Sequence, residues 1–237
     1  MNIKNQQGAT LIMVLIVLLL ISSIATIAMK TGMFGLRLST NNQVDSLLLE
    51  NNNSALFNLE DPSKVSQRLA TNSMYGHFLS NANADDTLVF CYRSSQSEFF
   101  DITRASVLGN SKLGSQGYCG ESDFSGGRQV VISQIYISRA PDNDGTPLAG
   151  LATGVSIGQG SIGITKMKMN ATSISILPSF ANSGIKDIVE CLGSTYTKIE
   201  DSVNCLGRAK VPYNRQDAQY MIGTDFQNVN TKPATTP

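Results

Sequence analysis

The stretch ATLIMVLIVLLLISSIATIAM, Ala9–Met29, decides how the rest of this chain is interpreted, because it holds 21 residues and no charge. As a helix it would span about 30 Å, the thickness of the hydrocarbon core of a bilayer. It therefore predicts a membrane segment. Hydropathy alone fits a retained anchor and also a cleaved signal peptide, in which Leu11–Ile21 would be the apolar region and small residues such as Ala25 would precede the cleavage site.

The residues on either side of this run favour a retained helix. The eight residues before it, MNIKNQQG, end in Gly8 and carry one lysine in place of the basic region that opens a signal peptide. Beyond it, apolar residues continue at helical spacing, at Met33, Leu36, Val44 and Leu47. The pattern predicts one helix of about 45 residues, apolar and then amphipathic, that stops near Asn51-Asn52-Asn53. A signal peptide has no reason to share a helix with the mature domain.

These residues resemble the start of a type IV pilin. Pilins begin with a short leader that ends in glycine, here Gly8, followed by the first mature residue, here Ala9, then Thr-Leu and a long apolar helix. Within that superfamily QQGATLIMVLIVLLL is most similar to the minor pilins of the PilX type. The resemblance covers about the first 50 residues well and the remainder only in general layout. It implies cleavage after Gly8 by a prepilin peptidase, methylation of the Ala9 amine, and packing of the helix into the core of a filament.

One position departs from the pilin pattern. Pilins usually carry glutamate at the fifth mature residue, whereas this chain has Met13. In a filament core a buried N-terminal ammonium is costly unless a neighbouring carboxylate compensates it. A subunit with Met13 offers no carboxylate to the subunit ahead of it, and only the filament tip has no subunit ahead. The resemblance therefore implies a place in the tip complex. In an ordinary single-pass anchor, Met13 would simply fill an apolar helix.

The rest of the chain is expected to form a globular α+β domain. Asp61-Pro62 is typical of an N-cap followed by proline at the first helical position, which predicts a short helix through about Ala70. An antiparallel sheet packed on the long helix fits the order of the runs that follow. These β-branched or alternating runs predict strands at Thr87–Arg93, Gln129–Ala140, Ile162–Met169, Thr172–Leu177 and Ile185–Leu192.

The expected organisation has five parts. They are a leader peptide at residues 1–8, a transmembrane or filament-core helix at 9–29, the amphipathic half of the same helix at 30–60, a periplasmic or extracellular α+β domain at 61–224, and a flexible tail at 225–237.

The four cysteines fit an exported domain. They allow three pairings, and the separations of 28 and 14 residues favour the sequential bonds Cys91–Cys119 and Cys191–Cys205. Neither spacing is a CxxC, which argues against zinc binding and redox catalysis. Each bond would contribute about 3 kcal/mol in the chain-entropy treatment. The alternative is four reduced thiols in a cytosolic protein, which the membrane segment disfavours.

The composition favours a structural or interaction protein over an enzyme. Lys+Arg and Asp+Glu number 18 each, only 15% of residues are charged, and Ser, Thr and Asn make up 63 of 237. Without clustered cations, no direct binding of nucleic acid is expected. The GxSxG string Gly154–Gly158 lacks a histidine after its serine, because the single histidine is His77. No cofactor is expected.

Asp142 and Asp144 are a weak candidate for a metal site. Their setting, DNDG, resembles the start of a calcium loop, because closely spaced Asx oxygens suit that cation. The twelfth position of such a loop, however, holds Thr153 in place of the closing acidic ligand. A turn explains the same residues, so no metal is predicted.

The expected function is that of a minor pilin that primes assembly of a type IV pilus and caps it within a tip complex, supporting pilus biogenesis, twitching motility, adhesion or DNA uptake. Expected partners are other minor pilins and the major pilin through the N-terminal helix, the prepilin peptidase, a tip adhesin, and the inner membrane before assembly. The chain would cross that membrane once, with its N-terminus cytoplasmic, and then reach the pilus tip. Two alternatives stay open: the tip pseudopilin of a type II secretion system, and an exported binding protein or hydrolase with a conventional signal peptide.

Overall fold

The computed structural model describes residues 7–224, except positions 69, 71, 94, 97, 110–112, 115, 141–164 and 182. The expected leader up to residue 6 and the expected tail 225–237 lie outside the described residues. The helices are α1 (Gln7–Glu60), α2 (Val65–Arg68), α3 (Met74–His77), α4 (Ile185–Glu190) and α5 (Ile199–Arg208), with 3-10 turns at Pro62–Lys64, Asn81–Asn83, Ile102–Arg104 and Pro178–Phe180. The strands are β1 (Thr87–Tyr92), β2 (Ser106–Val107), β3 (Ile132–Arg139), β4 (Thr165–Ile176) and β5 (Tyr213–Thr224).

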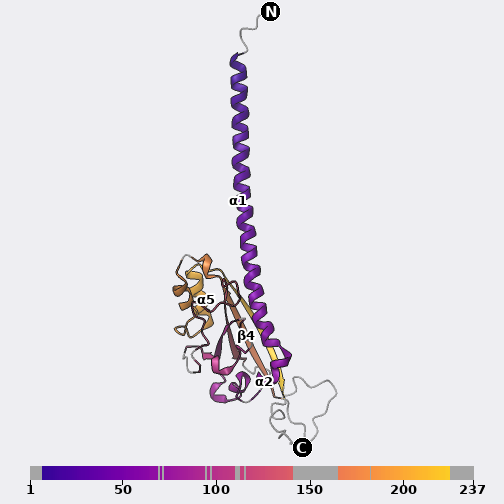
Figure 1. Cartoon of the computed structure of the whole chain (residues 1–237), viewed down its shortest axis with the longest axis vertical. Coiled ribbons are helices and arrows are strands. Elements are labelled where there is room, and N and C mark those ends of the chain that lie inside the picture. The colour runs from indigo at the N-terminus through magenta and orange to yellow at the C-terminus, as the bar shows by residue number, and fades with distance from the viewer. Residues whose placement is uncertain are drawn as a thin grey trace, which may run out of the picture. The chain divides into compact units, whose positions relative to one another are not determined.

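The long helix α1 has 54 residues and is shared by two compact units (Figure 1). The first unit, Met1–Ser46, contains the helix alone among its described residues, and the second, Leu47–Pro237, contains the last turns of α1 together with the sheet. A break in the helix at Asn51-Asn52-Asn53 was expected from the asparagines, and this is wrong: α1 runs to Glu60, the last residue of the expected amphipathic half. The helix continues because the Asn51 and Asn52 side chains find hydrogen-bond partners that leave the helical backbone intact.

The C-terminal end of α1 is fixed by residues that follow it. Asp61 Oδ1 accepts hydrogen bonds from the Ser63 main-chain N–H (3.0 Å) and hydroxyl (2.7 Å), so it opens the next short helical segment as predicted. The buried Arg68 Nη1 donates to the carbonyl of Leu59 at 2.6 Å, one of the last α1 carbonyls without a partner inside the helix. Its guanidinium carbon lies 5.1 Å from the centre of the Phe100 ring. The negative end of the helix dipole also stabilises a positive charge at this position.

The five strands form one antiparallel sheet in the order β2-β1-β3-β4-β5. The predicted α+β class and the antiparallel sheet are therefore confirmed. Strands β4 and β5 pair over twelve consecutive residues, from Thr165↔Thr224 to Ile176↔Tyr213. β5 is an edge strand, so one side of its main chain has no neighbouring strand among the described residues.

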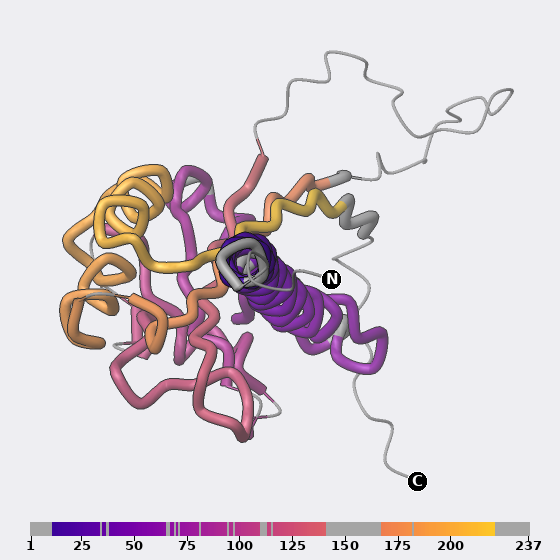
Figure 2. The backbone as a smooth tube through the Cα atoms, turned by 90° about the horizontal axis from the view of Figure 1, so that it is seen from above, coloured from indigo at the N-terminus to yellow at the C-terminus, as the bar shows by residue number. Residues whose placement is uncertain are grey.

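Two hydrophobic clusters lie on the two faces of the sheet. Figure 2 traces the backbone of the elements that carry them. On one face, Ala55, Leu56 and Leu59 of α1 pack with side chains of β1, β3 and β4. On the other face, α4 and α5 cover one end of the sheet, where Ile188 and Leu206 pack on strand residues. We call the face that carries α4 and α5 the outer face. It is covered only in part.

Three elements differ from the sequence prediction. Ile185–Leu192 was expected to be a strand, but Ile185–Glu190 forms α4. As a helix, this segment buries Ile188 against the sheet, with Ile185 and Val189 partly buried beside it. Burial in the tertiary structure therefore outweighs the β propensity of these β-branched residues. Strand β5 and helix α5 were not predicted, because YNRQDAQY is too polar to stand out as a strand.

Candidate functional sites

The predicted processing positions lie near the start of α1. Gly8 and Ala9 are helical residues, and Met13 follows one turn later as an exposed residue, at 72% of its accessible surface. The next large apolar residues, from Leu15 to Met33, are also exposed, each by half or more of its surface. Among the described residues, α1 is the one helix long and apolar enough to cross a membrane, judged by length and composition.

The few polar side chains in this apolar segment bond to their own helix. The hydroxyls of Ser22, Ser23 and Thr31 donate to main-chain carbonyls three or four residues earlier, at 2.8 to 3.0 Å. Such bonds satisfy the hydroxyl without water. The segment can therefore enter a lipid or protein interior with little cost from its polar groups.

The junction between α1 and the sheet is a buried polar network centred on Asn52, which is fully buried. Asn52 Nδ2 donates to the main-chain carbonyl of Asn214 (3.0 Å) and to its side-chain Oδ1 (2.9 Å). Asn52 Oδ1 accepts from the hydroxyls of Ser173 (2.8 Å) and Ser175 (2.7 Å). A primary amide has two donor hydrogens and two acceptor lone pairs, so every hydrogen-bonding position of this amide is occupied.

Both pairs of cysteines form disulfides, and each joins the neighbours favoured by the sequence. Cys91 of β1 is bonded to Cys119, which lies between β2 and β3, and Cys191, just after α4, is bonded to Cys205 in α5. All four cysteines are therefore paired. The second disulfide holds α4 and α5 together on the outer face of the sheet.

The weak metal candidate and the GxSxG string both fall in a part of the chain that the structure does not describe. Asp142, Asp144 and the string Gly154–Gly158 lie outside the described residues. Among the described residues, no group of three or more His, Cys, Asp or Glu side chains is placed to hold a metal ion. His77 Nε2 contacts Asp86 Oδ2 at 2.8 Å and lies beside the ring of Phe78, so the single histidine is a packed residue.

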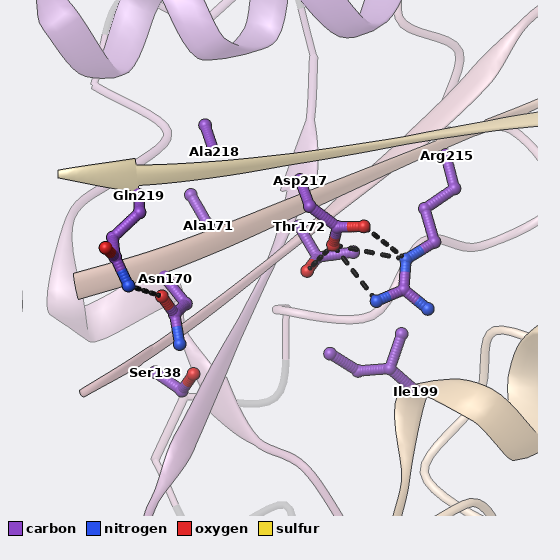
Figure 3. A pocket seen from close by; sticks show the side chains of 9 residues that line it. All are labelled: Ser138, Asn170, Ala171, Thr172, Ile199, Arg215, Asp217, Ala218 and Gln219. Atoms are coloured by element: carbon purple, nitrogen blue, oxygen red, sulfur yellow. Dashed lines mark hydrogen bonds and ion pairs between the residues drawn. The ribbon is translucent and has the colours of Figure 1, made fainter. Parts of the chain in front are cut away.

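A cavity of about 400 Å³ lies on the outer face, over β3, β4 and β5 (Figure 3). It is a second candidate site that sequence analysis missed. Ser138, Asn170 and Gln219 are directly opposite one another on the three strands and form one row of its floor. Thr172 and Asp217 form the next row, and Ile199 of α5 contributes an apolar wall. Ala171 and Ala218 point to the other side of the sheet, so only their main chain lines the cavity.

Arg215 and Asp217, which both line the cavity, form an ion pair in which their opposite charges cancel. Arg215 Nε lies 2.9 Å from Asp217 Oδ2, and Arg215 Nη2 lies 3.0 Å from Oδ1. Thr172 donates its hydroxyl hydrogen to the same carboxylate at 2.5 Å. Burial raises the pKa of Asp217, but hydrogen bonds from Arg215 and Thr172 outweigh it and bring the pKa below its ordinary value. The hydrogen bonds to Asp217 raise the pKa of Arg215, so both groups are charged at neutral pH.

No protein-family model, curated protein or solved structure matches this chain.

Proposed function

We propose that this chain is a minor pilin, processed after Gly8, that primes assembly of a type IV pilus and caps it as part of a tip complex. The observation that carries the proposal is the form of α1. Its apolar segment starts directly after Gly8, exposes large apolar side chains, and continues as the same helix into the turns that pack on the sheet. The role is structural and involves no catalytic step by this chain.

The two parts of α1 suit two successive environments. About 25 cal/mol is gained for each Å² of apolar surface removed from water, so residues such as Leu15 and Leu19 strongly favour a bilayer or a bundle of helices. In the proposal this segment first crosses the inner membrane and then packs against the helices of other minor pilins and the major pilin. The later turns hold the domain that faces the cell exterior, and the two disulfides suit an oxidising compartment.

Met13 supports a position at the tip. After cleavage the Ala9 amine becomes a new positive charge, which a carboxylate from the following subunit would neutralise in the filament core. Met13 supplies no carboxylate to a subunit ahead, so growth occurs on one side of this subunit only. A tip adhesin can then bind the outward side.

The mature N-terminus tests this proposal directly. Mass spectrometry of the protein purified from cells is expected to give an N-terminal peptide that starts with methylated Ala9. A mature protein that starts near Thr26 or Met29 would show cleavage by signal peptidase. It would contradict the pilin proposal and favour an exported binding protein or hydrolase.

A further inference from the structure

The polar cavity over β3, β4 and β5 has hydrogen-bonding groups that the fold does not use. Gln219 Nε2 donates to Asn170 Oδ1 at 3.0 Å, and this bond fixes the orientation of both amides. It leaves the two N–H groups of Asn170 Nδ2, the Gln219 Oε1 and the Ser138 hydroxyl without a partner among the described residues. Figure 3 shows the three side chains on the same side of the sheet.

These groups form a row of alternating hydrogen-bonding character. Because the three residues are directly opposite one another on adjacent strands, they lie about 4.8 Å apart. Along the row, Gln219 offers an acceptor, Asn170 offers donors, and Ser138 offers both. A ligand that meets such a row must itself donate and accept at close intervals. Hydroxyl groups do both.

The charge of the cavity selects against ions. Its one cation, among the described lining residues, is Arg215, and Asp217 already holds it with two hydrogen bonds. A phosphate or carboxylate would meet a guanidinium whose charge Asp217 already neutralises, and would be repelled by Asp217 and by Glu200, whose Oε1 lies 3.7 Å from Arg215 Nη1. A neutral ligand meets neither obstacle.

The volume of the cavity and its apolar wall also suit a small neutral ligand. A volume of about 400 Å³ lies within the range of small-molecule sites. Ile199 presents an apolar surface beside the polar row, where the C–H face of a sugar ring can be removed from water. We infer that the outer face of this sheet binds a neutral saccharide, with Asn170, Gln219 and Ser138 as the residues that recognise its hydroxyls.

The inference does not depend on the proposed function, because it rests on the second unit alone. Its main competitor is an added peptide strand at the edge of β5. The bond from the Leu177 N–H to the Pro212 carbonyl (3.0 Å) sets the alternation of the ladder, so the main-chain groups of Arg215, Asp217 and Gln219 point to the free edge. A peptide would bind these groups, whereas a sugar would bind the side chains.

The experiment is a saturation-transfer NMR titration of the full-length protein in a zwitterionic detergent that has no sugar headgroup. The probes are the methyl glycosides of galactose, glucose, mannose and N-acetylglucosamine. At least one of them is expected to show saturable transfer. Asn170→Ala and Gln219→Ala are each expected to weaken its binding about tenfold, the size of effect that lost hydrogen bonds produce. Ser138→Ala, at the other end of the row, provides a further variant if Asn170→Ala does not fold.

Gln216→Ala is the matched control. Gln216 is an amide on the same strand whose side chain lies on the other face of the sheet, so binding is expected to stay unchanged. The saccharide site is overturned if none of the four glycosides gives saturable transfer, or if the floor variants bind as well as the wild type. It is also overturned if a peptide of sequence YNRQDAQYMI slows hydrogen exchange at the edge amides while no glycoside binds.

Discussion

The side-chain amide of Asn52 donates to the main-chain carbonyl of Asn214 at 3.0 Å, and so joins the long helix to the edge strand of the sheet across 162 residues of sequence. Asn52 is fully buried, and its Oδ1 accepts hydrogen bonds from the hydroxyls of Ser173 and Ser175 on β4. Burying a polar group costs free energy unless its partners are in place. This network therefore specifies one position of the α1 turns on the sheet.

Replacing Asn52 by alanine is expected to lower the free energy of unfolding by about 3 kcal/mol, because the variant loses the buried hydrogen bonds of Asn52 to Asn214, Ser173 and Ser175 and leaves the Ser173 hydroxyl without its partner. Chemical denaturation of the full-length protein in detergent, followed by tyrosine fluorescence, measures the change. Asn53→Ala is the control. Asn53 is the exposed neighbour on the same helix, and its loss should change stability by less than about 0.5 kcal/mol.

The same asparagines show where sequence reasoning fails. A triplet of asparagines favours the end of a helix, because each side chain competes for the backbone. Asn51 bonds instead to the Leu47 carbonyl of its own helix, and Asn52 bonds to residues more than a hundred positions away. Only the second interaction is invisible from local sequence. The long helix, the sheet and the strands near Thr87, Gln129 and Thr172 were predictable because hydrophobic periodicity is local.

The cavity on the outer face was not predictable for a related reason. Ser138, Asn170 and Gln219 are spread over 82 positions and meet only because the strand register places them opposite one another. Strand β5, which supplies Gln219, was itself missed. The disulfide pairs, by contrast, follow from short separations that favour closing small loops.

Asp123 is expected to contribute stability that depends on pH. Hydrogen bonds from Arg93, at 2.6 and 2.7 Å, lower the pKa of Asp123 although its partial burial opposes this. A carboxyl whose pKa is lower in the folded state stabilises the protein above its unfolded pKa of 3.8, and this contribution is lost as the pH falls through the folded value. Asp123→Asn should therefore be less stable than the wild type at pH 7, with a difference that shrinks below pH 3.8.

Thermal unfolding from pH 7 down to pH 2 measures this difference. Glu121→Gln, an exposed carboxylate in the same loop, is the control and should follow the wild-type curve. A gap between Asp123→Asn and wild type that stays constant over the whole range would contradict the ion-pair explanation.

The disulfide between Cys191 and Cys205 is expected to hold α4 and α5 on the sheet. The double variant Cys191→Ala and Cys205→Ala should lose about 3 kcal/mol of stability, the chain-entropy value for a loop of this length. Peptide mapping without reductant should find Cys91 joined to Cys119 and Cys191 joined to Cys205 in separate fragments. Free thiols, or a fragment that joins Cys119 to Cys191, would show that the compartment or the connectivity is different.

Processing after Gly8 is expected to need a minimal side chain at that position. Gly8→Leu should leave the precursor uncleaved and pili scarce, and an intact-mass measurement detects the retained leader. Gly32→Leu is the control, because a Cβ placed at this glycine of the same helix has no other atom within 4 Å. Cleaved and methylated protein from Gly8→Leu would remove the assignment as a pilin.

A place at the tip predicts very few copies of this chain per pilus, together with a sharp loss of piliation when it is deleted. The physical reason is the charge of the Ala9 amine. A following subunit can neutralise that amine with its own glutamate, whereas Met13 neutralises nothing for a subunit ahead, so the chain can start a filament but cannot extend one. Met13→Glu supplies the missing carboxylate and is expected to allow incorporation along the shaft, while Met13→Gln, of similar size without the charge, is expected to stay at the tip. Immunogold labelling compares the three proteins. Gold particles spread evenly along wild-type pili, at the density of the major pilin, would make the tip position untenable and leave only general membership of the filament.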